Sequence, residues 1–207
     1  MKRVLKKDLQ KILCAAILSL LTMTVSAQAV ALNTDGQDSA YVETIKGRAQ
    51  KIVDGLQLTD AQKALNVRNI IANRYFLLND IHNKYDKTQQ AARDAELYKH
   101  HFELASALAL HITEEQIDAV KDGMTYGRLK RDYKAQCEMI PTLTDEEKAQ
   151  ILIWLKEARE YAIDAADSKG KHFWFDKYRG RTNNWLSARG YDLKKERENW
   201  QKRLENK

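Results

Sequence analysis

The sequence predicts an all-α protein, a single-domain bundle of five or six helices with an irregular, aromatic-rich C-terminal lobe. Three observations support this class. Apolar residues recur with helical spacing over most of the chain, whereas the alternation typical of strands is scarce. The 207 residues include one proline, Pro141, and only eight glycines. Threonines followed by acidic residues and then by Gln or Glu mark several helix starts.

The N-terminal residues 1–29 have the pattern of a secretory signal peptide. Basic residues precede an apolar run, Ile12 to Val25, that is shorter than a typical bilayer span. Small residues follow this run, so cleavage is expected after Ala27 or Ala29. We therefore expect a periplasmic or secreted protein with no stable membrane insertion after cleavage, and an uncleaved N-terminal anchor is the alternative.

Cleavage of the signal peptide lowers the net positive charge of the protein, and this net charge bears on which partners it can bind. The whole chain has 35 basic and 29 acidic residues, and residues 1–29 hold five of the former and one of the latter. The mature domain, 30–207, therefore has 30 basic and 28 acidic residues. This near balance argues against nucleic acid as a partner. Cys137 is the only cysteine left, so the domain is expected to depend on its core and not on a disulfide.

Segments of helical periodicity define the bundle in order. Gly55 marks the end of the first helix. Leu58–Gln62, Ile112–Gln116 and Leu143–Glu147 share the order apolar, Thr, acid, any residue, Gln or Glu, which predicts a capping box at each start. Gly123 and Gly127 predict a kink or loop within the fourth helix. The predicted helices occupy residues 42–54, 59–85, 88–108, 113–138, 144–167 and 192–204.

The composition shifts after Asp167, where helical periodicity weakens. The segment Lys171–Trp185 carries five aromatic residues, four Lys or Arg, one His and two adjacent Asn. We expect residues 168–207 to form the irregular lobe, with one or two short helical turns between Gly180 and Gly190. Residues 30–38, at the other end of the domain, are expected to be flexible.

Several short motifs occur in a recognisable order along the second half of the chain. They are Pro141-Thr142-Leu143-Thr144, Leu155–Glu160, Lys171-His172, Lys177–Leu186 and Gly190-Tyr191-Asp192. In these motifs the chain resembles a family of exported proteins of unknown function from glycan-degrading, gut-type Gram-negative bacteria. The resemblance extends from about Tyr41 to Asp192. It implies an accessory, sugar-binding role beside polysaccharide-degradation machinery, and it supplies no catalytic residues.

Residues 171–191 combine flat rings with hydrogen-bond donors. Rings stack on the C–H faces of sugars, amides bond to hydroxyl groups, and Arg forks bind a uronic acid carboxylate through two hydrogen bonds. We therefore predict carbohydrate, including an acidic oligosaccharide, as the partner. The alternative is that the rings form a hydrophobic clasp that pins the lobe to the bundle. The predicted binding residues are Trp174, Tyr178, Arg179, Arg181, Asn183, Asn184 and Trp185.

Two other functions remain open. Glu160, Asp164 and Asp167 share one helix face shortly before His172, which is a candidate set for general acid–base chemistry in a glycan hydrolase or lyase. The absence of a nucleophile motif favours binding over catalysis. The Leu-Thr-x-x-Gln repeats suggest a holdase-like periplasmic chaperone, although helix capping alone explains them. No metal or cofactor is expected, because the sequence has neither a paired-Cys motif nor His-Glu-x-x-His.

Overall fold

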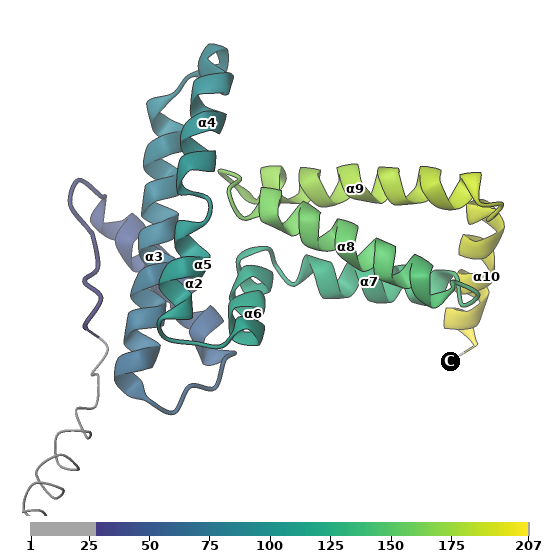
Figure 1. The fold of residues 1–207 in the computed structure, drawn as a ribbon, viewed down its shortest axis with the longest axis horizontal. Helices are drawn as coiled ribbons and strands as arrows, with labels where there is room; N and C mark the ends of the chain where they lie inside the picture. Colours follow the sequence, from purple (N-terminus) through teal and green to yellow (C-terminus); the bar gives the residue numbers. More distant parts are fainter. Residues whose placement is uncertain (1–27, 207) are drawn as a thin grey trace, which may run out of the picture.

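The computed structural model describes residues 28–206 as a chain of helices joined by short turns and preceded by an extended segment (Figure 1). The expected signal peptide, 1–29, lies outside the described residues except for its last two positions. The helices are α2 (Ser39–Asp54), α3 (Ala61–Lys84), the 3-10 helix η1 (Lys87–Gln89), α4 (Gln90–His100), α5 (Glu103–Ala109), α6 (Glu114–Met124), α7 (Arg128–Met139), α8 (Asp145–Ala162), α9 (Ser168–Ala188) and α10 (Leu193–Glu205). None of them is both long and apolar enough to cross a membrane.

The helices pack around two hydrophobic cores. The first core joins residues of α2, α3, α5 and α6, and we call residues 28–124 the N-lobe. The second joins residues of α7, α8 and α9, with residues of α10 packed against it, and we call residues 128–206 the C-lobe. In Figure 1, α7, α8 and α9 extend side by side away from the N-lobe, and α10 crosses their far end. The expected C-terminal lobe, 168–207, is thus one part of a unit that also includes α7 and α8.

The all-α class is confirmed, but the expected count of five or six helices is wrong. The predicted helix 88–108 is broken into α4 and α5, and 113–138 into α6 and α7. Between α6 and α7 the chain takes positive φ at Tyr126 (61°) and Gly127 (62°). This left-handed turn ends one helix and starts the next, as the two glycines of this segment indicated.

The expected irregular structure after Asp167 is also wrong, because residues 168–188 form the continuous helix α9. Its buried positions are Lys171, Phe175, Tyr178, Thr182 and Leu186, which follow a helical period. Two of these five residues, Lys171 and Thr182, are polar, so the spacing of apolar residues alone does not reveal the helix. Packing against α8 outweighs the low helix propensity of Gly170 and Gly180.

Capping explains where most helices begin. The predicted capping boxes at Thr113 and Thr144 are confirmed, with their partners Gln116 and Glu147. The one predicted at Thr59 is wrong. Asp60 caps α3 instead, by accepting a hydrogen bond from the Lys63 amide. Gln62, the expected reciprocal partner, donates to Asn66 Oδ1 at 3.0 Å and is therefore occupied elsewhere.

A row of three asparagines on α3 binds the extended N-terminal segment. Asn66, Asn69 and Asn73 lie at i, i+3 and i+7, on one face of the helix. Asn66 accepts from the Val30 amide (3.0 Å) and donates to the Gln28 carbonyl (3.2 Å). Asn69 donates to the Val30 carbonyl, and Asn73 bonds both the Asn33 amide and the Ala31 carbonyl. The segment expected to be flexible, 30–38, is therefore hydrogen-bonded along its first residues.

Replacing Asn66 with alanine is expected to lower the free energy of unfolding by about 1–3 kcal/mol, because the Asn66 side chain is fully buried and its bonds to the Val30 amide and the Gln28 carbonyl are partly shielded from water. Asn73→Ala is the matched control. Its bonds are exposed and exchange with water, so the expected loss is below about 1 kcal/mol. Urea unfolding of the chain 28–207 measures both values, and equal losses would contradict this account.

Candidate functional site

The loop between α8 and α9 enters the N-lobe. Ile163 is 1% exposed and belongs to the N-lobe core, although the helices on either side of it belong to the C-lobe. Its neighbour Asp164 accepts a hydrogen bond from Arg74 Nη2 of α3 at 2.5 Å. The Arg74 side chain is 3% exposed and that of Asp164 14%, so this ion pair between the lobes is largely buried.

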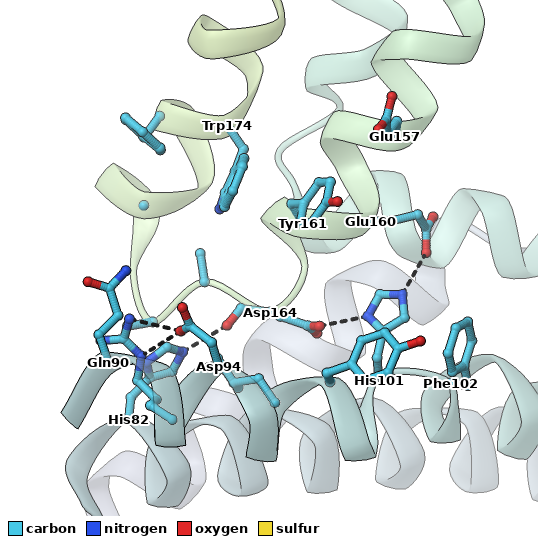
Figure 2. A pocket seen from close by; sticks show the side chains of 17 residues that line it. His82, Gln90, Asp94, His101, Phe102, Glu157, Glu160, Tyr161, Asp164 and Trp174 are labelled. Carbon is cyan, nitrogen blue, oxygen red and sulfur yellow. Dashed lines mark hydrogen bonds and ion pairs between the residues drawn. The ribbon is translucent and has the colours of Figure 1, made fainter. Parts of the chain in front are cut away.

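Two histidines complete the surroundings of Asp164 (Figure 2). His101 lies between α4 and α5, and its Nδ1 is 2.7 Å from Asp164 Oδ2. His82 of α3 bonds the Asp164 backbone carbonyl through Nε2 at 2.8 Å. Because carbonyl and carboxylate oxygens accept here, these ring nitrogens carry the hydrogens. The N-lobe therefore fixes Asp164 from three directions.

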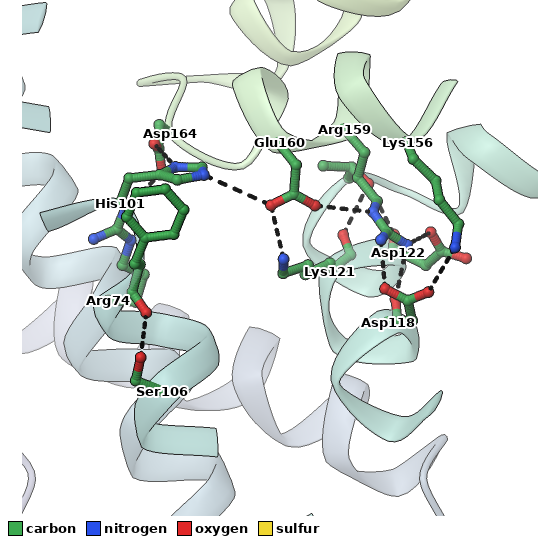
Figure 3. A network of polar contacts seen from close by, with 12 residues as sticks. Arg74, His101, Ser106, Asp118, Lys121, Asp122, Lys156, Arg159, Glu160 and Asp164 are labelled. Atoms are coloured by element: carbon green, nitrogen blue, oxygen red, sulfur yellow. Dashed lines mark hydrogen bonds and ion pairs between the residues drawn. The ribbon is translucent and has the colours of Figure 1, made fainter. Parts of the chain in front are cut away.

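A second polar network continues along α8 from Glu160 (Figure 3). Glu160 Oε2 accepts from Lys121 Nζ at 2.7 Å and lies 3.7 Å from His101 Nε2. The preceding residue, Arg159, is 3% exposed and reaches α6, where it pairs with Asp118 (2.5 Å) and Asp122 (3.0 Å). The two networks connect α8 to α3, α4 and α6, so the start of the C-lobe is held at a fixed position on the N-lobe.

Lys171 of α9 adds a buried cation at this junction. Its Nζ donates to the Met124 carbonyl at 2.8 Å and lies 5.1 Å from the centre of the Tyr75 ring. The residue is only 4% exposed. Burial, together with the nearby Arg48, lowers the pKa of Lys171 from 10.5 to about 8.

A cleft of about 660 Å³ lies between the lobes, above Asp164 and Glu160. Figure 2 shows rings of α8 and α9, including Tyr161 and Trp174, across the cleft from His101 and Phe102. Tyr161 and Trp174 are stacked at 4.5 Å and 19°. The cleft is lined by His82, Gln90, Arg93, Asp94, Leu97, Tyr98, His101, Phe102, Glu157, Glu160, Tyr161, Asp164, Ala165, Ala166, Gly170, Phe173 and Trp174.

The walls of this cleft are unusually apolar for an exposed surface. Tyr98 is 70% exposed, Phe102 63%, Phe173 57% and Tyr161 48%. Single exposed rings are normal on protein surfaces, but a contiguous group of exposed rings is typical of a ligand-binding groove or an interaction site. The cleft volume also lies within the range of about 300–1,000 Å³ that is usual for small-molecule sites.

The polar part of the lining is mainly acidic. Asp94, Glu157, Glu160 and Asp164 supply four carboxylates, whereas Arg93 is the one Lys or Arg among the lining residues. Carboxylates and the amide of Gln90 are good acceptors and donors for hydroxyl groups. Each of these carboxylates also pairs with a Lys or Arg, and Arg93 itself pairs with Asp94. The lining therefore offers no free cation to an anionic ligand, and the cleft suits a neutral one.

The four catalytic candidates separate in the structure. Glu160 and Asp164 both line the cleft. Asp167 is the N-cap of α9 and accepts from the Gly170 amide at 2.7 Å. His172 accepts from Arg128 Nη1 at 3.0 Å and packs against Tyr126. Its position outside the cleft lining removes the expected grouping with the carboxylates.

The predicted binding residues lie on different faces of α9. Trp174 lines the cleft. Tyr178 is buried, and burial followed by its hydrogen bond to Glu157 raises its pKa. Arg181 lies 4.7 Å from the Trp154 ring and 3.4 Å from Glu157, and Trp185 packs edge-on against the same Trp154. These three side chains support the α8–α9 contact.

The remaining three residues point elsewhere. Arg179 forms an exposed pair with Asp176 at 3.3 Å. Asn183 is half-buried and, with Arg179, lines a separate cavity in the C-lobe. Asn184 is exposed. The structure thus brings together Trp174, Glu160 and Asp164 from the predicted residues, and it does not bring the two arginines into the cleft.

Several cleft residues were missed from the sequence. Tyr98 and Phe102 have the helical spacing of a core face, and this spacing does not distinguish a core from a cleft wall. The contact of His101 with Asp164 joins positions 63 residues apart, so no local motif indicates it. In the part of the chain that the structure describes, no group of three or more His, Cys, Asp or Glu is arranged to hold a metal ion.

The fold and the site together define a two-lobed, all-α protein with an aromatic-walled cleft between its lobes. The chain belongs to the DUF3826 family, described as proteins of unknown function, whose family model matches residues 42–94 and 85–206. These ranges include both lobes and every residue named above as lining the cleft. No curated protein matches the chain.

The buried amine of Lys171 predicts an unusual pH dependence of stability. Its pKa is about 8 in the folded protein and near 10.5 when unfolded, so the unfolded chain binds more protons between these values. The Lys171 contribution to the free energy of unfolding should therefore rise from about pH 8 towards pH 10.5, by up to about 3 kcal/mol.

Urea unfolding at pH 7.5, 8.5 and 9.5 tests this prediction against Lys171→Met, which keeps the apolar stem without the amine. The difference in unfolding free energy between wild type and variant should shift in favour of wild type as pH rises. Parallel profiles for the two proteins would show that the amine titrates normally.

Proposed function

We propose that this protein binds a neutral oligosaccharide in the cleft between its lobes. The observation that carries the proposal is the combination of exposed rings and carboxylates on one concave surface. Tyr98, Phe102, Tyr161, Phe173 and Trp174 supply apolar planes, and Glu157, Glu160 and Asp94 supply acceptors for hydroxyl groups. Sugars present both kinds of surface, an apolar C–H face and hydroxyl groups that donate to carboxylate oxygens.

The cellular setting is part of the same proposal. The pattern of residues 1–29 and the resemblance of the motifs between Pro141 and Asp192 support an exported, periplasmic accessory protein of polysaccharide use. The residues that line the cleft favour a different ligand from the acidic oligosaccharide that the sequence predicted. Arg179 and Arg181, on which the acidic oligosaccharide was predicted, lie outside the cleft lining, so a neutral glycan is the better candidate there.

Catalysis is the second candidate, and one specific contact favours it. His101 bridges two carboxylates of the cleft, with Nδ1 at 2.7 Å from Asp164 and Nε2 at 3.7 Å from Glu160. Such a chain can transfer protons. However, Asp164 is also paired with Arg74, and Glu160 with Lys121. Both carboxylates are thus already engaged in ion pairs within the protein, which favours a binding role over that of a general acid.

The binding proposal is tested by calorimetry of the protein with neutral and uronic oligosaccharides. Trp174→Leu and Tyr161→Leu should each weaken binding of the neutral ligand about fivefold, since each removes a stacking plane worth roughly 1 kcal/mol. Trp185→Leu is the matched control. It removes a tryptophan from the same helix that packs on Trp154 and does not line the cleft, so affinity should stay unchanged.

Chromatography of the same mixtures detects turnover. Product that disappears in Glu160→Gln, while binding persists, would favour the enzymatic candidate. If no neutral oligosaccharide binds, or if Trp185→Leu weakens binding as much as Trp174→Leu, the cleft is not the glycan site. Suppression of client aggregation without any glycan binding would favour the chaperone.

A further inference from the structure

A second cavity, separate from the cleft, lies inside the C-lobe. It has a volume of about 200 Å³ and is formed by α7, α8, α9 and α10. Its apolar lining comes from Met139, Ile151 and Leu155. Polar side chains and one tryptophan complete it: Asp132, Gln136, Arg179, Asn183, Arg197 and Trp200. Two of these, Arg179 and Asn183, belong to the motif that the sequence singled out and that the cleft does not use.

Two guanidinium groups give this cavity a positive character. Arg179 has only an exposed pair with Asp176 at 3.3 Å, a type of contact that contributes little. Arg197 forms no ion pair with any carboxylate among residues 28–206. The nearby carboxylate of Asp132 is already bound by Arg128 Nε at 2.8 Å. The cavity can therefore accept an anion without displacing a strong internal pair.

A buried donor in the same cavity lacks an acceptor. The Nε2 atom of Gln136 is inaccessible to solvent and has no hydrogen-bond partner in the described part of the chain. A buried amide left unpaired destabilises the protein, so such groups often indicate a missing partner. Asn183, on the facing helix α9, offers a further amide.

We propose that this cavity binds a sugar acid. Arg179 and Arg197 bind the carboxylate, Trp200 contacts the ring, and Asn183 bonds to hydroxyl groups. The mixture of donors and one apolar ring distinguishes this ligand from a simple inorganic anion, which would use the arginines alone. The uronic acid expected from the sequence is thus assigned to Arg179 with Arg197 and not to Arg179 with Arg181.

Calorimetry and saturation-transfer NMR with sodium glucuronate test the proposal. Arg179→Met and Arg197→Met should each reduce affinity at least tenfold, because each removes half of the carboxylate site. Arg181→Met is the matched control. It lies two residues from Arg179 but contacts Trp154 and Glu157 on the other side of α9, so it should bind glucuronate like wild type. Melting curves of all three variants verify that they remain folded.

The outcomes separate this cavity from the cleft. Trp174→Leu should leave glucuronate binding unchanged, because Trp174 lines the cleft between the lobes and does not line the C-lobe cavity. Absence of saturable glucuronate binding up to roughly 10 mM would overturn the proposal. So would equal affinity for glucuronate in wild type and Arg197→Met. If glucose binds as tightly as glucuronate, the site does not recognise the carboxylate. If benzoate binds as tightly as glucuronate, the site does not recognise the hydroxyl groups.

Discussion

The ion pair between Arg74 and Asp164 is the contact on which the arrangement of this molecule depends. It joins α3, the central helix of the N-lobe, to the loop that connects the two longest helices of the C-lobe. Removing either partner would leave the other charge buried, which typically costs about 3–5 kcal/mol. His82 and His101 bond the same aspartate from the N-lobe, and Ile163 is buried beside it. An ion pair, hydrogen bonds and apolar burial therefore all fix the short loop between α8 and α9 to the N-lobe.

The cleft follows from this junction. Its aromatic walls come from helices of different lobes, Tyr98 and Phe102 from one and Tyr161 and Trp174 from the other. Neither lobe alone forms a concave surface of this kind, so the geometry of the cleft depends on how firmly the junction holds. The pairs of Arg159 with Asp118 and Asp122 strengthen it from α6. A binding site built in this way couples ligand affinity to the stability of the interface between the lobes.

Local signals of the sequence predicted the fold class and most helix starts, because capping residues and apolar spacing act within a few positions of one another. Thr113, Thr144 and Asp192 show this directly. The helix α9 was missed because Lys171 and Thr182 occupy its buried face, where Lys171 bonds to the Met124 carbonyl at the end of α6. For the site, Glu160, Asp164 and Trp174 were among the candidates, but their assembly requires His101 and Arg74, which lie far away in sequence. No local pattern could supply those contacts.

A double-mutant cycle on Arg74 and Asp164 tests the central claim most directly. Unfolding free energies are measured for wild type, Arg74→Met, Asp164→Asn and the double variant. Each single change should destabilise the protein by about 3 kcal/mol, and the double variant by clearly less than the sum, with a coupling above about 1 kcal/mol. Additive losses, within about 0.5 kcal/mol, would contradict the claim that this pair holds the lobes together.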